Sequence, residues 1–420
     1  MATPPRLPRE DGAGVLRPLS AGRGGGGFFA ALDELRLAQQ QQQLVHDVVN
    51  TSSSTPQAKF VSTRRLGREE VLRAIEDVAG KVLASIARKQ APSLSCVDRH
   101  SWATVRFNKE VGLQMLPELV LREQKFTMQG SMLNFCMTMK VLHMIYNLVQ
   151  TNQNSTKRDI YYQYPTVFRS QTIVNNIVDN IACLLRVPRD CLHVQSTSKG
   201  CVAGNLCYIE EDGTKISCTC SSNGMLVSNN VQGMHNLTTK ARFVLVVEKD
   251  ATFQHLLDDG FCKRFHPCIM VTGKGVPDLN TRLLVRKLWD TFHIPTLALV
   301  DADPHGFEIM TIYKYGSLSM SFDAANLTVP TICWLGVLPS EIERWNIPTT
   351  VLLPLSDRDQ RKLRELLGRP FMELHPEWRN ELEILQARAV KAEMQALESI
   401  SPGLLSRYYL PNKLRFGGWL

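Results

Sequence analysis

The sequence has none of the features that would place it in a membrane or give it a nucleotide site. No run approaches the roughly 18 consecutive apolar residues of a membrane-spanning helix, and the start, MATPPRLPRE, contains no apolar leader. The phosphate-binding pattern G-x-x-x-x-G-K-[ST] is absent, so the chain has no evident ATP site of its own. These absences predict a nuclear or cytoplasmic protein with no membrane contact.

Cysteine pairs at metal-binding spacing are absent as well. The eleven cysteines are scattered singly, apart from Cys218-Thr-Cys220. A Cys-x-Cys pair without a second pair is a poor zinc site. Cysteines inside apolar runs, such as Cys136 and Cys268, are typical of small buried hydrophobic residues. The pattern fits a reducing compartment.

The length and the charge of the chain bound its organisation. With 420 residues it is long enough for two domains. The net charge of +8 favours a polyanionic partner, although evenly spread lysines would give the same total. Residues 1–65 contain runs of Gly, Gln and Ser that predict a disordered arm, in which residues 28–42 have the spacing of a short helix.

Helical patterns follow the arm. Residues 68–89 form an amphipathic pattern that predicts a helix packed on its own domain or on another subunit. Residues 131–150 are apolar nearly all round, so we expect a buried helix. A third helix is predicted over 171–185, then a short strand over 191–194 and a hairpin over 206–218 closed by Asp212-Gly213. Helices followed by a hairpin are the order of a winged helix-turn-helix, whose last helix enters the DNA major groove.

The stretch STKRDIYYQYPTVF, residues 155–168, carries two adjacent tyrosines on a predicted short helix. Arg158 and Tyr162 are four apart and so share a face of that helix. A phenol with a pKa of about 10 is neutral at pH 7, and a nearby guanidinium or metal ion favours the phenolate that attacks phosphorus. Paired aromatic residues on an amphipathic helix are more often core residues, and this stretch alone leaves both interpretations open.

From residue 241 the pattern changes to apolar strands alternating with helices. Strands are predicted over 243–248, 268–273 and 296–303, and helices over 251–258, 280–292 and 307–315. This alternation predicts a parallel sheet covered on both faces. The remainder is predicted to be mostly helical, with residues 358–367 and 378–400 as the clearest segments. The expected fold is therefore α/β plus α+β.

Carboxylates gather where ligands collect in such a sheet, at the carboxyl ends of the strands. Glu248 ends the first strand, and Asp301 and Asp303 end the third. Three carboxylates at one edge repel one another without a cation, and oxygen-only ligands suit Mg²⁺. A turn at Asp303 and a helix cap at Glu248 are the alternative. We expect His305, between Pro304 and Gly306, to be a turn residue rather than a ligand.

Five motifs, KRDIYY, STSKG, VVEKDATF, TGKGVPD and LVDADPHG, occur in an order that resembles the A subunit of type VI (type IIB) DNA topoisomerases and their eukaryotic meiotic double-strand-break relatives. The resemblance covers residues 66–420. It implies a winged-helix domain over 66–235 and a Toprim metal-binding domain with a helical C-terminal extension over 241–420. It also implies that Tyr162 is the nucleophile, that Arg158 assists it, and that Glu248, Asp301 and Asp303 bind Mg²⁺.

The same resemblance implies a DNA transesterase that makes meiotic double-strand breaks through a 5′-phosphotyrosyl link. Its expected partners are double-stranded DNA, a second copy of the chain, other meiotic break-forming proteins and a topoisomerase VI B-like subunit bound through helix 68–89. Its expected location is the nucleus, on meiotic chromosomes. The segment Gln163-Tyr-Pro-Thr166 departs from the family's more polar turn and adds the hydroxyl of Tyr164. Candidate DNA contacts are Lys157, Lys199 and Lys274.

Two other functions remain open on the sequence. One is a DNA-binding scaffold with a degenerate Toprim site, which needs only the winged helix and the positive charge. The acidic trio argues against it, because a scaffold has no use for three clustered carboxylates. The other is a hydrolytic nuclease or primase-like enzyme that uses the metal without a tyrosine.

Overall fold

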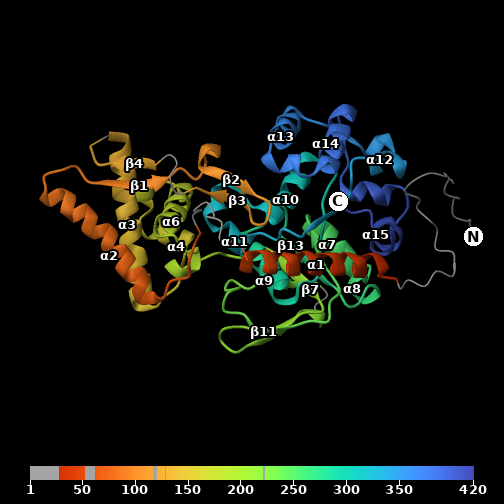
Figure 1. The fold of residues 1–420 in the computed structure, drawn as a ribbon, viewed down its shortest axis with the longest axis horizontal. Helices are drawn as coiled ribbons and strands as arrows, with labels where there is room; N and C mark the ends of the chain where they lie inside the picture. Colours follow the sequence, from red (N-terminus) through yellow and green to blue (C-terminus); the bar gives the residue numbers. More distant parts are fainter. Residues whose placement is uncertain (1–27, 53–61, 117–120, 128, 221–222) are drawn as a thin grey trace, which may run out of the picture.

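The computed structural model describes residues 28–52, 62–116, 121–127, 129–220 and 223–420. Figure 1 shows an elongated molecule with a helical part at one end and an α/β part at the other. None of the described helices has the length and apolar character needed to cross a membrane.

The helical part is built on α2 (Arg68–Ala87), α3 (Gln129–Thr151) and α6 (Gln171–Leu185), which confirms the three predicted helices. They share one apolar core, because each presents a stripe of aliphatic residues to the others. Two short helices, α4 (Lys157–Gln163) and α5 (Pro165–Phe168), lie between α3 and α6 in the chain. The antiparallel pair β1 (Ser93–Val97) and β4 (Leu121–Lys125) packs against α6 and α3.

The hairpin expected as a wing is present but packs elsewhere. Its strands are β8 (Cys207–Ile209) and β9 (Lys215–Ser217), and β8 also pairs with β11 (His235–Thr238). Tyr208 and Cys218 are buried in the core of the α/β part, not beside α6. The strand expected over 191–194 is instead a 3₁₀ turn followed by β6 (Val194–Gln195), which pairs with β5 (Ser155–Thr156).

The α/β part contains a six-stranded sheet in the order β10-β7-β13-β12-β14-β15. Strands β13, β12, β14 and β15 are parallel, while β7 runs antiparallel to β13 and β10 antiparallel to β7. The bounds of the strands are β7 (Cys201–Gly204), β10 (Met225–Leu226), β12 (Val244–Val247), β13 (Ile269–Thr272), β14 (Thr296–Leu299) and β15 (Cys333–Gly336). The predicted parallel strands are confirmed, and β7 and β10 come from the segment assigned to the first domain.

Each face of this sheet has its own apolar core. Along β12, Val244 and Val246 belong to one core while Leu245 and Val247 belong to the other, as the alternation of side chains along a strand requires. The helices that cover these faces include α7 (Asp250–Asp258), α8 (Phe261–Arg264), α9 (Leu279–Phe292), α10 (Pro304–Tyr315), α13 (Asp357–Leu367), α14 (Pro376–Arg388) and α15 (Leu410–Phe416). The shorter elements are α11 (Ala324–Leu327), α12 (Glu341–Arg344), β16 (Leu353–Pro354) and β17 (Val390–Lys391).

Helix α1 (Ala30–Ser52) lies within the expected disordered arm; it confirms the short helix predicted over residues 28–42 and continues beyond it to Ser52. It packs along α15, and Leu32 is only 1% exposed. The ring of Phe29 lies 6.3 Å from that of Phe243, so an apolar stripe of α1 completes the core beneath it. The rest of the expected arm, residues 1–27 and 53–61, lies outside the described residues.

The helix expected over residues 378–400 is wrong beyond Arg388. Ala389 has a φ of 54°, a left-handed conformation that ends α14. The chain then turns back, and Ala392 forms an antiparallel bridge with Ala302. This return brings residues 390–394, which we call the strap, across the edge of the sheet where β14 ends.

A second hairpin joins the two parts of the molecule. Strands β2 (Val105–Asn108) and β3 (Gly112–Met115) lie between them in Figure 1. The ring of Phe107 packs edge-on against Tyr315 of α10 at 4.9 Å, and the Thr328 hydroxyl donates to the Val111 carbonyl at 2.8 Å. These contacts tie the helical part to the α/β part.

Candidate functional site

The two tyrosines of α4 differ in how far their side chains are exposed to solvent. Thr156 caps the helix, accepting a hydrogen bond from the backbone N–H of Asp159 at 3.1 Å, and Ile160 is fully buried in the helical core. Successive residues point about 100° apart on a helix. Tyr161 is therefore half-buried against the helical core, whereas Tyr162 is 64% exposed.

The two basic residues of α4 also differ. Arg158 is exposed and shares a face with Tyr162. Lys157 instead turns inward, and its ammonium lies 2.6 Å from the Asp179 carboxylate of α6. Burial lowers the pKa of Lys157 to about 8, with Asp179 opposing the shift. Lys157 thus holds α4 on α6, and its contact with DNA stays a prediction.

Tyr164 lies where α4 ends and α5 begins. The ammonium of Lys140 on α3 lies over its ring, 4.1 Å from the centroid, a cation–π contact. Phe168, at the end of α5, is fully buried. Within the departing segment Gln163–Thr166, Tyr164 thus contacts α3, while Gln163 and Thr166 are exposed.

The three carboxylates come from the ends of two neighbouring parallel strands. Glu248 follows β12, and Asp301 and Asp303 follow β14. Glu248 Oε2 accepts a hydrogen bond from the backbone N–H of Asp301 at 2.9 Å, and both residues are buried, at 8% and 3% exposed. The structure thus brings Glu248 and Asp301 together, as their strand ends predicted.

Glu248 and Asp301 both have pKa values raised above those of exposed carboxyl groups. Burial and then the charge of Asp301 raise the pKa of Glu248 well above its ordinary value. Burial also raises the pKa of Asp301, although hydrogen bonding to Lys249 opposes the shift. Both shifts mean that positive charge at this edge would stabilise the ionised pair.

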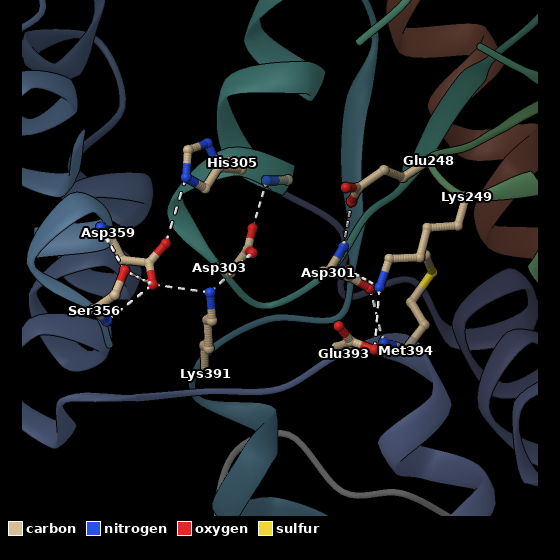
Figure 2. Close-up of polar contacts among 11 residues, drawn as sticks. Glu248, Lys249, Asp301, Asp303, His305, Ser356, Asp359, Lys391, Glu393 and Met394 are labelled. Atoms are coloured by element: carbon tan, nitrogen blue, oxygen red, sulfur yellow. Dashed lines mark hydrogen bonds and ion pairs between the residues drawn. The ribbon is translucent and has the colours of Figure 1, made fainter. Parts of the chain in front are cut away.

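Figure 2 shows which groups the aspartates contact. Asp301 Oδ2 lies 2.6 Å from the ammonium of Lys249, and its Oδ1 accepts from the backbone N–H of Met394 at 2.8 Å. Asp303 Oδ1 accepts from the Gly306 N–H at 2.6 Å, which caps α10, and its Oδ2 lies 4.0 Å from the ammonium of Lys391.

The donor set fits a magnesium ion in its chemistry. Three carboxylates at one edge are the oxygen ligands that Mg²⁺ prefers, and the ammonium of Lys249 already places positive charge on Asp301. No group of three or more acidic, His or Cys residues has a metal-binding arrangement in the described part of the chain. The three predicted ligands lie at one edge of the sheet, but Asp301 and Asp303 contact other partners there.

His305 faces away from Glu248, as Figure 2 shows. Its Nε2 lies 3.4 Å from Asp359 Oδ1. Burial of Asp359 favours its neutral form, but hydrogen bonds from Lys391 and Ser356 outweigh it and lower its pKa to about 2. His305 is not the turn residue that the sequence predicted, because it lies in the first turn of α10; its side chain contacts Asp359, which Lys391 and Ser356 also contact.

Three charged residues of the site escaped the sequence analysis: Lys249, Lys391 and Glu393. Lys249 had a signal, because it adjoins Glu248. Lys391 and Glu393 had none, since they lie about 90 residues after Asp301 in the chain and only the return of the strap places them here.

Lys199 and Lys274 meet near the same edge. The ammonium of Lys199 donates to the Lys274 carbonyl at 3.2 Å, and that of Lys274 lies 3.1 Å from Asp250. The next residue, Gly275, donates its N–H to the Glu248 carbonyl at 2.8 Å. The structure thus clusters two of the three predicted DNA-contact lysines beside the carboxylates.

Tyr162 and the carboxylates belong to different parts of the chain's fold. Helix α4 packs on α6 within the helical core, whereas Glu248 lies between β12 and α7 in the α/β part. Figure 1 shows α4 and α7 well apart. One copy of the chain does not bring the tyrosine to its own carboxylates in this conformation.

Comparisons with known proteins agree with this division. Residues 243–414 match the Toprim domain of the Topoisomerase 6 A subunit/Spo11 family, and residues 133–194 match the family described as Type IIB DNA topoisomerase. The Meiotic recombination protein SPO11 of Mus musculus is 53% identical over 393 residues, 94% of this chain and 97% of the relative. The chain belongs to the topoisomerase VI A subunit/Spo11 family.

Other relatives extend the comparison within the family. The Meiotic recombination protein SPO11 of Homo sapiens is 55% identical over 358 residues, 85% of this chain and 90% of the relative. The DNA topoisomerase 6 A subunit of Arabidopsis thaliana is 35% identical over 351 residues, 82% of this chain and 80% of the relative. The Toprim match contains all three carboxylates and the strap, and the type IIB match contains α4 with both tyrosines.

Gly306 is needed for the close packing of this Toprim edge. A Cβ there would lie 2.6 Å from the Asp301 carbonyl oxygen and 2.9 Å from Glu248 Oε2. We expect Gly306→Ala to lower the free energy of unfolding by about 1–3 kcal/mol through overpacking, measured by urea denaturation. Gly80→Ala is the matched control, because a Cβ added at Gly80 in α2 would meet no atom within 4 Å beyond the backbone of its own helix, and it should raise the free energy of unfolding by about 0.5–1 kcal/mol. Equal stabilisation by both substitutions would contradict the prediction.

Proposed function

We propose that this family member is a DNA transesterase that makes meiotic double-strand breaks. The Tyr162 hydroxyl loses its proton and its oxygen attacks a backbone phosphorus. The bond from phosphorus to the 3′ oxygen breaks, and that oxygen takes up a proton. The products are a 5′-phosphotyrosyl link and a free 3′-hydroxyl, and no water is consumed. The observation that carries the assignment is the exposure of Tyr162 beside Arg158, while Tyr161 packs into the core.

The position of each charged residue decides its role in the proposed reaction. Arg158 is exposed on the face of α4 that carries Tyr162, where its guanidinium stabilises the negative charge of the pentacovalent phosphate. Glu248, Asp301 and Asp303 would hold Mg²⁺, which when bound supplies positive charge at the phosphate. Lys199 and Lys274 contact the DNA backbone beside this edge.

Two copies of the chain form the working unit. One tyrosine cuts one strand, so a double-strand break needs two tyrosines related by two-fold symmetry. Because α4 lies apart from the carboxylates of its own chain, we propose that each site combines Tyr162 of one copy with the metal site of the other. DNA lies across both copies in the nucleus, on meiotic chromosomes.

The winged-helix domain was predicted over 66–235, but β7, β10 and the hairpin of β8 and β9 pack in the α/β part; the proposed domain is therefore the helical part, residues 66 to about 200. The strands beside α3 and α6 are β1 and β4, so this pair is the better candidate for the wing. The exposed residues of α6 are Thr172 and Asn176, while Asp179 and Asn180 are bound to Lys157 and Arg99. A groove contact by α6 would use its first two turns.

Helix α2 is the proposed contact with a topoisomerase VI B-like subunit. Its inner stripe is buried, but Leu83 and Ile86 near its C-terminal end are 65% and 55% exposed. Apolar residues that stay exposed next to each other on one helix are typical of a protein interface. Other meiotic break-forming proteins would join the assembly through such contacts.

Charge on this end of α2 should break that contact without harming the fold. We expect Leu83→Glu with Ile86→Glu to abolish co-purification with the B-like subunit, while the free energy of unfolding changes by less than about 0.5 kcal/mol. Leu37→Glu on α1 is the matched control, since Leu37 is also 59% exposed. Retained binding by the double variant, or equal loss in the control, would remove α2 from the interface.

Covalent trapping separates the proposal from its alternatives. We expect denaturation of the protein during cleavage to leave DNA bound to the chain, in a Mg²⁺-dependent manner. A DNA-binding scaffold would release intact DNA on denaturation. A hydrolytic Toprim nuclease would release cut DNA whose ends carry no protein.

A further inference from the structure

Lys249 and Glu393 form a charge pair that the proposed reaction does not use. Lys249 directly follows Glu248, and Glu393 lies on the strap. The ammonium of Lys249 lies 2.6 Å from Asp301 Oδ2 and 3.3 Å from Glu393 Oε2. One lysine thus bridges a buried carboxylate, whose side chain is 4% exposed, and a carboxylate that is 52% exposed.

Both oxygens of Asp301 are occupied in this conformation. Its Oδ1 accepts from the Met394 N–H, and its Oδ2 is held by Lys249. A divalent ion bound to Asp301 Oδ2 would stand next to the ammonium of Lys249, and the repulsion between the two positive charges at that distance favours departure of the ammonium. Lys249 is therefore in the position of a competitor for the metal.

Glu393 gives the displaced ammonium a second partner within reach. It comes from a different segment of the chain, the strap, whose backbone is fixed by the bridge between Ala392 and Ala302. Figure 2 shows Lys249 between Asp301 and the strap. The ammonium of Lys249 needs only a small movement away from the buried carboxylate to pair with Glu393 alone.

From this geometry we infer that Lys249 is an exchangeable internal cation for the Toprim site and that Glu393 is the residue that receives it when the metal enters. In the metal-free protein, Lys249 offsets the repulsion between Glu248 and Asp301. In the metal-bound protein, it is paired with Glu393. The inference rests on the metal site of the proposed function and assigns a positioning role to both residues.

Metal affinity measured directly tests this exchange. Mn²⁺ is the probe, and the loss of its free-ion electron paramagnetic resonance signal reports binding to the full chain without DNA. We expect Lys249→Met to tighten Mn²⁺ binding by about tenfold, because the competing charge is gone. Lys249→Arg keeps the charge and should bind Mn²⁺ within about threefold of the wild type. Lys249→Met should also melt at a lower temperature in chelator and recover when Mn²⁺ is added.

Glu393→Gln distinguishes a receiver from a ligand. If Glu393 acts through Lys249, Glu393→Gln weakens Mn²⁺ binding by about three- to tenfold in the wild type but has no effect in the Lys249→Met background. Equal weakening in both backgrounds would show that Glu393 acts on the metal itself and would overturn its receiver role. Lys362→Met is the charge control, because it removes a partly buried lysine of α13 that Glu308 holds at 3.0 Å. If it tightened binding as much as Lys249→Met, a general charge effect would replace the exchange.

The same titration separates this inference from the proposed metal site. Asp301→Asn should lose Mn²⁺ binding in every background. If wild-type binding is lost in Asp301→Asn but Lys249→Met binds no more tightly than the wild type, the metal site stands and the exchange is wrong. If neither the wild type nor Lys249→Met binds Mn²⁺, both the metal site and the exchange are wrong.

Discussion

Tyr162→Phe should abolish the covalent protein–DNA adduct, with a loss of at least about a thousandfold, because the substitution removes the attacking oxygen and nothing else. The ring is 64% exposed and makes little contact with the core, so the folded structure should be unaffected. The measurement is recovery of DNA bound to the denatured protein from meiotic cells. Thermal unfolding of the variant confirms that the fold is intact.

The neighbouring tyrosines supply matched controls. Tyr161 packs its ring against the helical core, and Tyr164 holds its ring under the ammonium of Lys140. Phenylalanine keeps both rings in place, so Tyr161→Phe and Tyr164→Phe should retain substantial adduct formation. Adducts that persist in Tyr162→Phe, or that vanish in Tyr161→Phe alone, would assign the nucleophile to another residue.

Mixing two inactive variants should restore cutting of one strand. Tyr162→Phe lacks the nucleophile, and Asp301→Asn lacks a metal ligand, so each alone should form no adduct. If sites are shared between copies, a mixed dimer has one site with both defects and one site with none. We expect such dimers, about half of a random equimolar mixture, to nick one strand and to make no double-strand breaks.

The physical reason is the separation between α4 and the Toprim edge. Helix α4 is fixed to the helical part by Ile160 and by the ion pair between Lys157 and Asp179. The hairpin of β2 and β3 ties that part to the α/β part. A tyrosine held this way meets a metal site most readily on another copy. Nicking measured on a supercoiled plasmid tests the arrangement, with differently tagged variants to verify mixed dimers. No nicking by purified mixed dimers would mean that each chain uses its own tyrosine and carboxylates.

Local pattern predicted the larger elements well. The strands of the parallel sheet are apolar without interruption because both faces of the sheet are covered. Such runs can be recognised in the sequence as buried strands. The same holds for α2 and α6, whose apolar stripes face one core. Because parallel strands present their carboxyl ends at one edge, Glu248 and Asp301 were also predictable neighbours.

The residue pattern of the sequence predicted the structure poorly in segments whose conformation depends on tertiary contacts. The hairpin of β8 and β9 has the residues of a wing, yet Tyr208 is buried against the sheet of the α/β part. Residues 378–400 have a helical composition, but Ala389 turns the chain back because Ala392 pairs with Ala302. The short helix predicted over residues 28–42 is confirmed, but its packing was not predicted: Leu32 is buried and the ring of Phe29 packs against the α/β part.

The sequence by itself determined the chemistry that this chain can offer: tyrosines beside basic residues on one helix, and carboxylates at the ends of parallel strands. Both follow from local periodicity, which depends on the nearest residues in the chain. The tertiary structure alone decided which tyrosine is exposed and that Lys249 occupies Asp301. It also alone decided that the strap crosses the Toprim edge with Lys391 and Glu393. The contacts at the Toprim edge join residues about 50 to 140 positions apart, and the exposure of the tyrosines depends on the packing of α4 against α6; a linear pattern carries no signal for either.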